Sequence, residues 1–197
     1  HRFHRTCASH AQGAAGILNA VRAGMDSIEH GIFMTQECLE AMLEKGTYLV
    51  PTLAAVNNIY SNRNNGIPDF IVEKTIRVRE RHHQSIKMFY DAGGKIAMGT
   101  DAGTPFNVHG ENSQELKFMV EIGISNNDAL KFSSANAADL MGIAYRGVIE
   151  EGFYADFLIV SGNPVEDIFA VSASVADLIK EITSSMLVNA TIKPASI

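Results

Sequence analysis

Short apolar runs alternate along the chain with segments in which apolar residues recur at helical spacing. The first clear helical segment runs from Gln12 to Ala23, where the apolar residues share one face and Gly24 follows. The run from Asp26 to His30 has the length and composition of a buried strand, and the two kinds of segment keep alternating further along the chain. The pattern predicts strands at 5–10, 26–30, 48–53 and 95–101, and helices at 12–23, 35–45, 70–91, 111–122 and 126–140.

This alternation predicts an α/β fold. Each right-handed crossover returns the chain to the same edge, so the strands should be parallel and the helices should lie outside them. Four strand–helix units are half of an eightfold barrel, and a complete barrel takes about 250 residues. We therefore expect residues 1–142 to form half of a TIM-like (β/α)8 barrel. Beyond Gly142, short apolar runs between glycines, such as Phe157 to Val160 and Met186 to Val188, predict a small β unit over residues 143–197.

The segment from Asn57 to Asp69 is rich in Asn, Gly, Ser and Pro, which predicts a loop. Such a loop either lines a binding site or is a plain surface excursion, and its composition leaves both readings open. The chain begins at His1, a few residues before the first expected strand. This favours a chain that starts in mid-fold over one with a processed N-terminus.

The composition excludes several classes of protein. The chain has 197 residues, 46% hydrophobic and 19% charged, which is typical of a globular protein with a sizeable core. Its formal net charge of -6 argues against nucleic acid as a partner. No apolar stretch reaches the roughly 18 residues of a membrane span, and the first residues do not resemble a signal peptide, so no membrane partner is expected. Cys7 and Cys38 have no CxxC spacing, and we expect buried thiols in a cytoplasmic protein.

Three side chains that can bind a metal ion stand at the ends of expected strands: His10, His30 and Asp101. The carboxyl ends of barrel strands form one face of the barrel, so these residues should converge there. Imidazole and carboxylate are good zinc ligands, and a catalytic zinc site keeps an open position for water. Hydrogen-bonded core residues are the alternative, which the agreement of three strand ends disfavours.

Other polar residues carry weaker signals. His82 and His83 are adjacent on an expected helix and diverge by about 100°, which favours a solvated helix face over a metal site. His109 lies in the loop after Asp101 and is either a substrate contact or a plain loop residue. The glycines around Asp101 lack the spacing of a phosphate-binding loop, and no Ser or Cys stands in a nucleophile elbow.

Four motifs together point to a known family. They are SHAQGAAGILNAVRAGMDSIEHG (Ser9 to Gly31), VPT (Val50 to Thr52), MGTDAGTP (Met98 to Pro105) and GVIEEGFYADFLIVSGNP (Gly147 to Pro164). With them, the chain resembles the metal-dependent amidohydrolase superfamily, in its branch of imidazolonepropionase-like proteins and Xaa-Pro dipeptidases (prolidases). The resemblance implies the C-terminal half of a (β/α)8 barrel, strands 5–8, followed by part of a β-sandwich built from both chain ends.

The resemblance also implies roles for individual residues. His10, His30 and Asp101 would bind one or two zinc ions, and Asp101 would move a proton from the attacking water to the leaving nitrogen. The family's HxH pair and bridging lysine would precede residue 1, so this chain would supply half a site. Gln12 stands where some relatives have a further histidine, and it is either a substrate contact or a helix-start residue. Tyr60 is either a phenolic donor to a substrate carboxylate or a packing aromatic.

One leading function and two rivals follow from these implications. The leading hypothesis is a cytoplasmic zinc-dependent hydrolase that acts on dipeptides of the Xaa-Pro type. The rivals are a cyclic-amide hydrolase of the imidazolonepropionase type and a non-catalytic fragment or partner module. The expected partners are a small-molecule or dipeptide substrate, the N-terminal half of the barrel, and further copies of the chain in a homo-oligomer.

Overall fold

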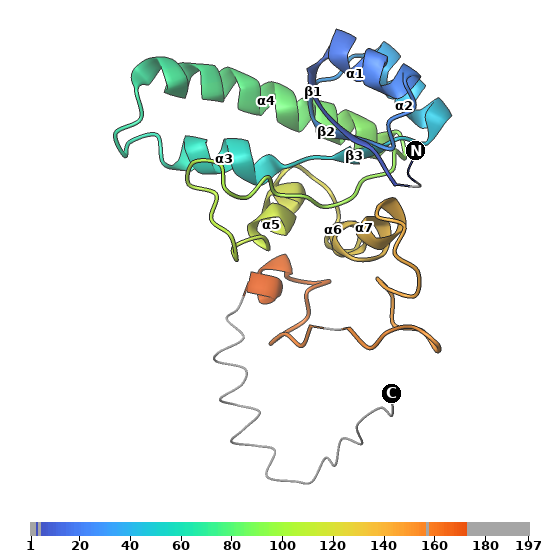
Figure 1. Ribbon diagram of the computed structural model, residues 1–197. Coiled ribbons are helices and arrows are strands. Elements are labelled where there is room, and N and C mark those ends of the chain that lie inside the picture. Colours follow the sequence, from blue (N-terminus) through green and yellow to red (C-terminus); the bar gives the residue numbers. More distant parts are fainter. Residues whose placement is uncertain (1–2, 4, 157, 173–197) are drawn as a thin grey trace.

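The computed structural model describes residue 3, residues 5–156 and residues 158–172 (Figure 1). Strands and helices alternate along its first part, as the apolar pattern predicts. The elements are β1 (Ala8–Gly13), α1 (Ala14–Arg22), β2 (Ser27–Phe33), α2 (Gln36–Lys45), β3 (Tyr48–Val50), α3 (Leu53–Ser61), α4 (Asp69–Asp91), α5 (Gln114–Glu121), α6 (Asn126–Ser133), α7 (Ala135–Leu140) and the 3-10 helix η1 (Ile168–Ser172). Among the described helices, none combines the length and the apolar character needed to pass through a membrane.

The three strands form a parallel sheet in the order β1-β2-β3. Ala8 pairs with Ser27, and Ser27 pairs with Tyr48, so the strands begin at a common edge. Helices connect the strands, as parallel neighbours require. The α/β class is therefore confirmed.

The fourth expected strand is reduced to a single bridge. Leu49 exchanges two backbone hydrogen bonds, of 2.8 and 3.1 Å, with the residues on either side of Ile96. Two residues later, Met98 N donates to the carbonyl of Phe132 at 2.9 Å, so the ladder stops. Asp101 thus follows one bridge rather than a strand of several paired residues.

The two faces of the sheet have different neighbours. Ile28 and Leu49 point into the main hydrophobic core, which they share with residues of α1, α2 and α4. The alternate residues Tyr48 and Val50 belong to a smaller cluster that packs against Leu140 of α7. In Figure 1, α1 and α2 lie above the strands, and α6 and α7 lie below them.

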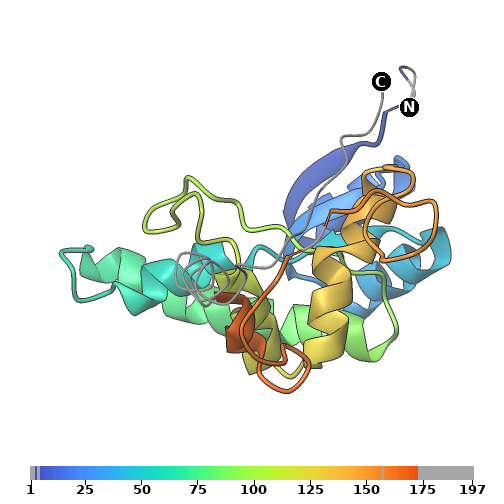
Figure 2. The ribbon, with the colours of Figure 1, turned by 90° about the horizontal axis from the view of Figure 1, so that it is seen from below.

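The loop predicted from Asn57 to Asp69 is wrong over its first part, because α3 continues to Ser61 and only residues 62–68 connect it to α4. Asn57 is 2% exposed, and its side-chain oxygen accepts a hydrogen bond from Arg79 of α4. Tertiary packing therefore overrides a composition that is typical of loops. The two helices lie side by side and extend beyond the sheet (Figures 1 and 2).

The helix predicted at 126–140 is divided into α6 and α7. Ser134 interrupts it with φ -126° and ψ -84°. The hydroxyls of Ser133 and Ser134 donate to the carbonyl of Leu130 at 2.9 and 2.8 Å. Such side-chain bonds compete with the helical hydrogen bonds.

The described residues beyond Gly142, 143–156 and 158–172, contain η1 and no strand. Phe157 lies outside the described residues, and 158–160, the rest of that apolar run, form no strand. The run from Met186 to Val188 also lies outside them, as does all of 173–197. The β unit over residues 143–197 therefore stays a prediction.

Candidate active site

Two of the expected metal ligands, His10 and His30, lie against each other. His30 Nε2 is 2.8 Å from His10 Nδ1, and the rings meet edge to face with centroids 4.5 Å apart. The residues come from neighbouring strands, and each lies within its strand rather than at its end. His10 is exposed and His30 is half-buried. The structure thus brings these two imidazoles together at one open edge.

A β-bulge makes this meeting possible. Ala11 pairs with His30 and Gly13 with Phe33, so two steps along β1 correspond to three along β2. Regular alternation would send the His30 side chain to the face that packs in the main core. His30 instead has φ 73°, and its side chain reaches His10. Bulges next to functional sites commonly redirect a side chain in this way.

The hydrogen bonds of Thr52 fix the tautomer of His30. Thr52 Oγ1 donates to the carbonyl of Pro51 at 2.6 Å, so in its 2.6 Å contact with His30 Nδ1 it accepts the proton. His30 therefore carries its proton on Nδ1 and a lone pair on Nε2, the atom that faces His10. Burial lowers the pKa of His30, and the charge of His10 lowers it further while Asp101 opposes both. The ring is held neutral.

Backbone strain gathers around the same residues. His30, Thr52 and Asp101 have φ of 73°, 55° and 54°, in the left-handed region that residues other than glycine rarely adopt. Each such residue costs about 1–3 kcal/mol and persists where its surroundings enforce it. Strain of this kind clusters at functional sites, and here it includes the candidate ligands His30 and Asp101.

Asp101 lies in a tight turn near the histidines. Asn107 Nδ2 donates to the carbonyls of Thr100 and Asp101 at 2.6 and 3.0 Å, which fixes the turn. The Asp101 side chain is exposed. Burial raises the pKa of Glu29, and the charge of Asp101 adds to this increase. Across the described part of the chain, no three His, Cys, Asp or Glu side chains stand close enough to hold a metal ion, so Asp101 does not close a three-ligand cluster with the histidines.

The prediction that His82 lies on a solvated helix face is wrong. His82 is fully buried on α4, and its Nε2 donates to the carbonyl of His30 at 3.0 Å. Burial, assisted by the charge of His83, lowers the pKa of His82 to about 3, so the ring is neutral. The signal was present in the sequence, because His82, Ile86 and Phe89 recur at helical spacing and all three are buried. His83 is half-buried, and burial is the main cause that lowers its pKa to about 4.

Sequence reasoning missed Glu115 of α5. This side chain is fully buried, and its two oxygens accept hydrogen bonds from the backbone N–H groups of Leu53 and Ala54, each at 2.7 Å. Burial raises the pKa of Glu115 to about 8, against the opposing effect of the two N–H groups. The helical spacing between Glu115 and the buried Met119 could have placed the carboxyl on the core face of the helix.

The sequence itself decides the family. The family model described as "Amidohydrolase family" matches residues 1–193. The chain belongs to the amidohydrolase family. Its similarity to solved Xaa-Pro dipeptidases and prolidases also confirms the branch that the four motifs indicated.

Three relatives define this similarity. A solved Xaa-Pro dipeptidase with bound methionine is 38% identical, with a TM-score of 0.79, over 86% of this chain and 42% of that one. A prolidase solved in complex with N-methylphosphonate-L-proline is 31% identical, with a TM-score of 0.74, over 83% of this chain and 40% of that one. Ochratoxinase of Aspergillus niger is 32% identical over 170 residues, which are 85% of this chain and 35% of that protein. The chain therefore spans well under half the length of these relatives.

The residues expected to contact substrate in this amidohydrolase occupy three different elements. Gln12 is exposed on β1 and lines a cleft of about 260 Å³ together with residues of α3 and α4. His109 is exposed in the loop after Asp101. Tyr60 lies on α3 rather than in a loop, and the guanidinium groups of Arg63 and Arg79 lie over its ring at 4.4 and 4.6 Å from the centroid. The roles of Gln12, His109 and Tyr60 in substrate binding stay predictions.

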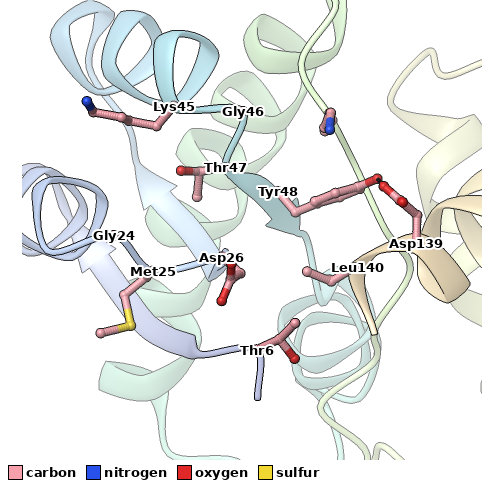
Figure 3. Close-up of a pocket in the computed structure, with 11 residues that line it drawn as sticks. Thr6, Gly24, Met25, Asp26, Lys45, Gly46, Thr47, Tyr48, Asp139 and Leu140 are labelled. Carbon is pink, nitrogen blue, oxygen red and sulfur yellow. Dashed lines mark hydrogen bonds between the residues drawn. The ribbon is translucent and has the colours of Figure 1, made fainter. Parts of the chain in front are cut away.

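A cavity of about 330 Å³ lies at the other end of the strands (Figure 3). Its lining includes Asp26 and Tyr48, at the beginnings of β2 and β3, together with Lys95 and Asp139. The Tyr48 hydroxyl donates to Asp139, and burial, followed by this contact, raises the pKa of Tyr48. Ligands of parallel α/β sheets bind beyond the carboxyl ends of the strands. This cavity is therefore separate from the candidate active site of the amidohydrolase.

Proposed function

We propose that this chain is the C-terminal, metal-binding half of a zinc-dependent amide hydrolase that acts on dipeptides of the Xaa-Pro type. The observation that carries the proposal is the histidine pair: His30 Nε2, left unprotonated by the Thr52 contact at Nδ1, lies 2.8 Å from His10 Nδ1. Membership in the amidohydrolase family supports amide hydrolysis. The dipeptidase and the prolidase among the similar structures support the substrate class.

The two histidines suit zinc in chemistry and in spacing. Two nitrogens bound to one tetrahedral zinc ion at about 2.0–2.1 Å stand roughly 3.3 Å apart, close to the 2.8 Å between His10 Nδ1 and His30 Nε2. Ligand histidines must be neutral, as His30 is. Asp101 offers an oxygen ligand on the adjacent turn. The further ligands, for one or two zinc ions, would come from an upstream half of a (β/α)8 barrel, since this chain covers 42% of the similar dipeptidase.

The reaction requires a proton to move from water to the leaving nitrogen. Zinc, when bound, would supply Lewis-acid activation of the scissile carbonyl and lower the pKa of water. The Asp101 carboxylate would accept the proton of the attacking water and donate it to the amide nitrogen as the C–N bond breaks. Its exposed position in the turn fixed by Asn107 keeps it accessible to both partners. The candidate substrate contacts are Gln12, His109 and Tyr60.

The scarcity of cysteine supports a cytoplasmic location for this enzyme. The chain holds two cysteines without CxxC spacing, and such usage suits a reducing compartment.

The test is metal content and hydrolysis by the full translated product of the gene, purified without chelator or added metal. We expect about one or two zinc ions per chain, and turnover of Xaa-Pro dipeptides that stops with a chelator and returns with zinc. Turnover of lactams without turnover of dipeptides would favour the cyclic-amide hydrolase instead. A protein that holds no zinc and hydrolyses neither would favour the non-catalytic partner module.

A further inference from the structure

Glu115 is an acid in a place where an apolar side chain would be easier to bury. It is fully buried among core residues of α5, and in the described part of the chain it forms no ion pair. Among the described residues, its hydrogen-bond donors are the backbone N–H groups of Leu53 and Ala54. Burying a carboxyl costs free energy, which its hydrogen bonds must offset, and an apolar side chain would avoid this cost. The role of Glu115 therefore depends on what these two bonds hold in place.

The two N–H groups belong to the first turn of α3, directly after Thr52. The first N–H groups of a helix have no partner within the helix, so an acceptor placed there fixes where the helix begins. Thr52, the residue before that turn, has φ 55° and ψ 40°. For a β-branched residue this left-handed conformation is an outlier that needs enforcement. Glu115 provides it by clamping the two residues that follow.

The strained conformation of Thr52 has one visible consequence at the histidine pair. It places Thr52 Oγ1 2.6 Å from His30 Nδ1, the contact that sets the tautomer of His30. Glu115, the first turn of α3, Thr52 and His30 thus form one continuous series of hydrogen bonds and peptide links from the core to the candidate metal ligand.

We propose that Glu115 is a positioning residue of the metal centre, which holds Thr52 in place through the N–H groups of Leu53 and Ala54 and thereby orients His30. This inference rests on the proposed function only in taking His30 as a metal ligand. The alternative is that Glu115 acts only as a helix cap, which stabilises α3 and leaves the orientation of His30 unaffected. The two differ in what happens at His30 when Glu115 changes.

The decisive variants are Glu115→Gln, Thr52→Val and the combination of both. Gln has the size of Glu but presents one acceptor oxygen instead of two, and Val removes the hydroxyl of Thr52 while keeping its shape. Contacts that orient a metal-binding histidine typically change metal affinity by about 10–100-fold. We expect a weakening of zinc affinity in this range for each single variant of the full-length protein. The double variant should be no weaker than Thr52→Val, because both act through one contact.

Two controls separate positioning from stability. Thr52→Ser keeps the hydroxyl and should keep zinc affinity close to the wild-type value. Met119→Ala removes a fully buried side chain of the same helix, so it should lower thermal stability and leave zinc affinity unchanged. Should Glu115→Gln fail to fold, Glu115→Asp, which keeps both oxygens on a shorter side chain, takes its place in the same measurements.

A second readout works on metal-free protein, so a failure of the metal proposal is distinguishable from a failure of this inference. Nitrogen-15 NMR of histidine-labelled protein, with His30 assigned through a His30→Gln variant, should show the Nδ1–H tautomer in the wild type and its loss in Glu115→Gln. An unchanged tautomer in Glu115→Gln would overturn the inference, whether or not zinc binds. Additive losses of zinc affinity in the double variant would overturn it as well.

Discussion

At the scale of single residues, His30 is constrained at three points. Thr52 holds Nδ1, His82 holds the backbone carbonyl, and His10 lies against Nε2. A ligand whose rotamer and tautomer are already fixed binds a metal ion in a geometry set in advance, which is how precise sites are built. The strain at His30 and Thr52 is maintained because buried side chains bond the adjoining backbone: His82 donates to the carbonyl of His30, and Glu115 accepts from the two N–H groups that follow Thr52.

Replacing His30 should therefore remove one metal ligand outright. We expect His30→Ala to weaken zinc binding by more than the roughly 100-fold limit typical of outer contacts, because a ligand itself is lost. Competition with a zinc chelator measures the change. His109→Ala is the matched control, since it removes an exposed histidine from the loop after Asp101 and should leave zinc affinity unaltered. Equal losses in the two variants would contradict the assignment of His30.

Glu115 should make the protein less stable as the pH rises. Its pKa in the folded state is about 8, above the ordinary value of 4.5, so between these values the folded state holds a proton that the unfolded state releases. The stabilising contribution is fully present below the unfolded pKa and is lost as the pH rises through the folded pKa. In Glu115→Gln nothing titrates at this position. The difference in unfolding free energy between wild type and variant should thus shift with pH, by about 1.4 kcal/mol per unit of pKa difference.

Urea unfolding at about pH 5 and about pH 9 gives this difference directly. The wild type should lose stability relative to Glu115→Gln between the two conditions. A difference that stays the same at both values of pH would show that the carboxyl does not titrate in this range.

At the scale of elements, the sequence could predict what depends on local periodicity. The apolar spacing of 12–23 and 70–91 gave α1 and α4 within two residues of their bounds. Prediction from apolar spacing failed where contacts between residues distant in the sequence determine the structure. The polar stretch after Asn57 is helical because Arg79 and the core hold it, and the strand before Asp101 is cut short because Met98 bonds Phe132.

The candidate site could be predicted in part for the same reason. The strand pattern before His10 and His30 predicts that they lie on neighbouring strands. In the structure their side chains are in contact. The bulge that turns His30 toward His10, and the tautomer that Thr52 imposes, depend on pairing register and on a contact across 22 positions of the chain. No local pattern carries that information. A lone acid such as Glu115 in an apolar helix belongs to no motif, although its helical spacing to the buried Met119 is visible in the sequence.

Two glycines test how tightly the elements are packed. A Cβ added at Gly94, after α4, would lie 2.4–2.5 Å from the ring of Phe89, which is fully buried. Gly94→Ala should therefore destabilise the protein by about 1–3 kcal/mol, as overpacking of a core does. Gly16, in the interior of α1, is the matched control, because its added Cβ would meet Ala11 at an ordinary 3.9 Å.

In Gly16→Ala the helix gains an alanine in place of glycine, which should stabilise it by about 0.5–1 kcal/mol. Thermal unfolding of the two variants against the wild type compares them directly. A melting temperature of Gly94→Ala at or above the wild-type value would contradict the close contact between Gly94 and Phe89.

At the scale of the whole molecule, the described residues leave much apolar surface uncovered. The face of the sheet that carries Tyr48 and Val50 has a small cluster, in contrast to the large core on the other face. Ile149 is 92% exposed and Met141 62%, and β1 has one neighbour in the sheet. Unpaired strand edges and apolar patches of this kind mark surfaces that another chain segment covers. They agree with the proposal that an upstream half completes the barrel.

The 197-residue chain produced by itself should then behave as an incomplete fold. We expect it to bind an apolar dye such as ANS and to associate in solution, because its open sheet edge and apolar patches have no cover. The full translated product of the gene should do neither to the same extent. Replacing Ile149 by Ser in the isolated chain should reduce dye binding, whereas Glu44→Ser, at an exposed charged position, should not. An isolated chain that is monomeric, unfolds cooperatively and binds no dye would contradict the half-barrel, since a half-barrel cannot bury its own inner face.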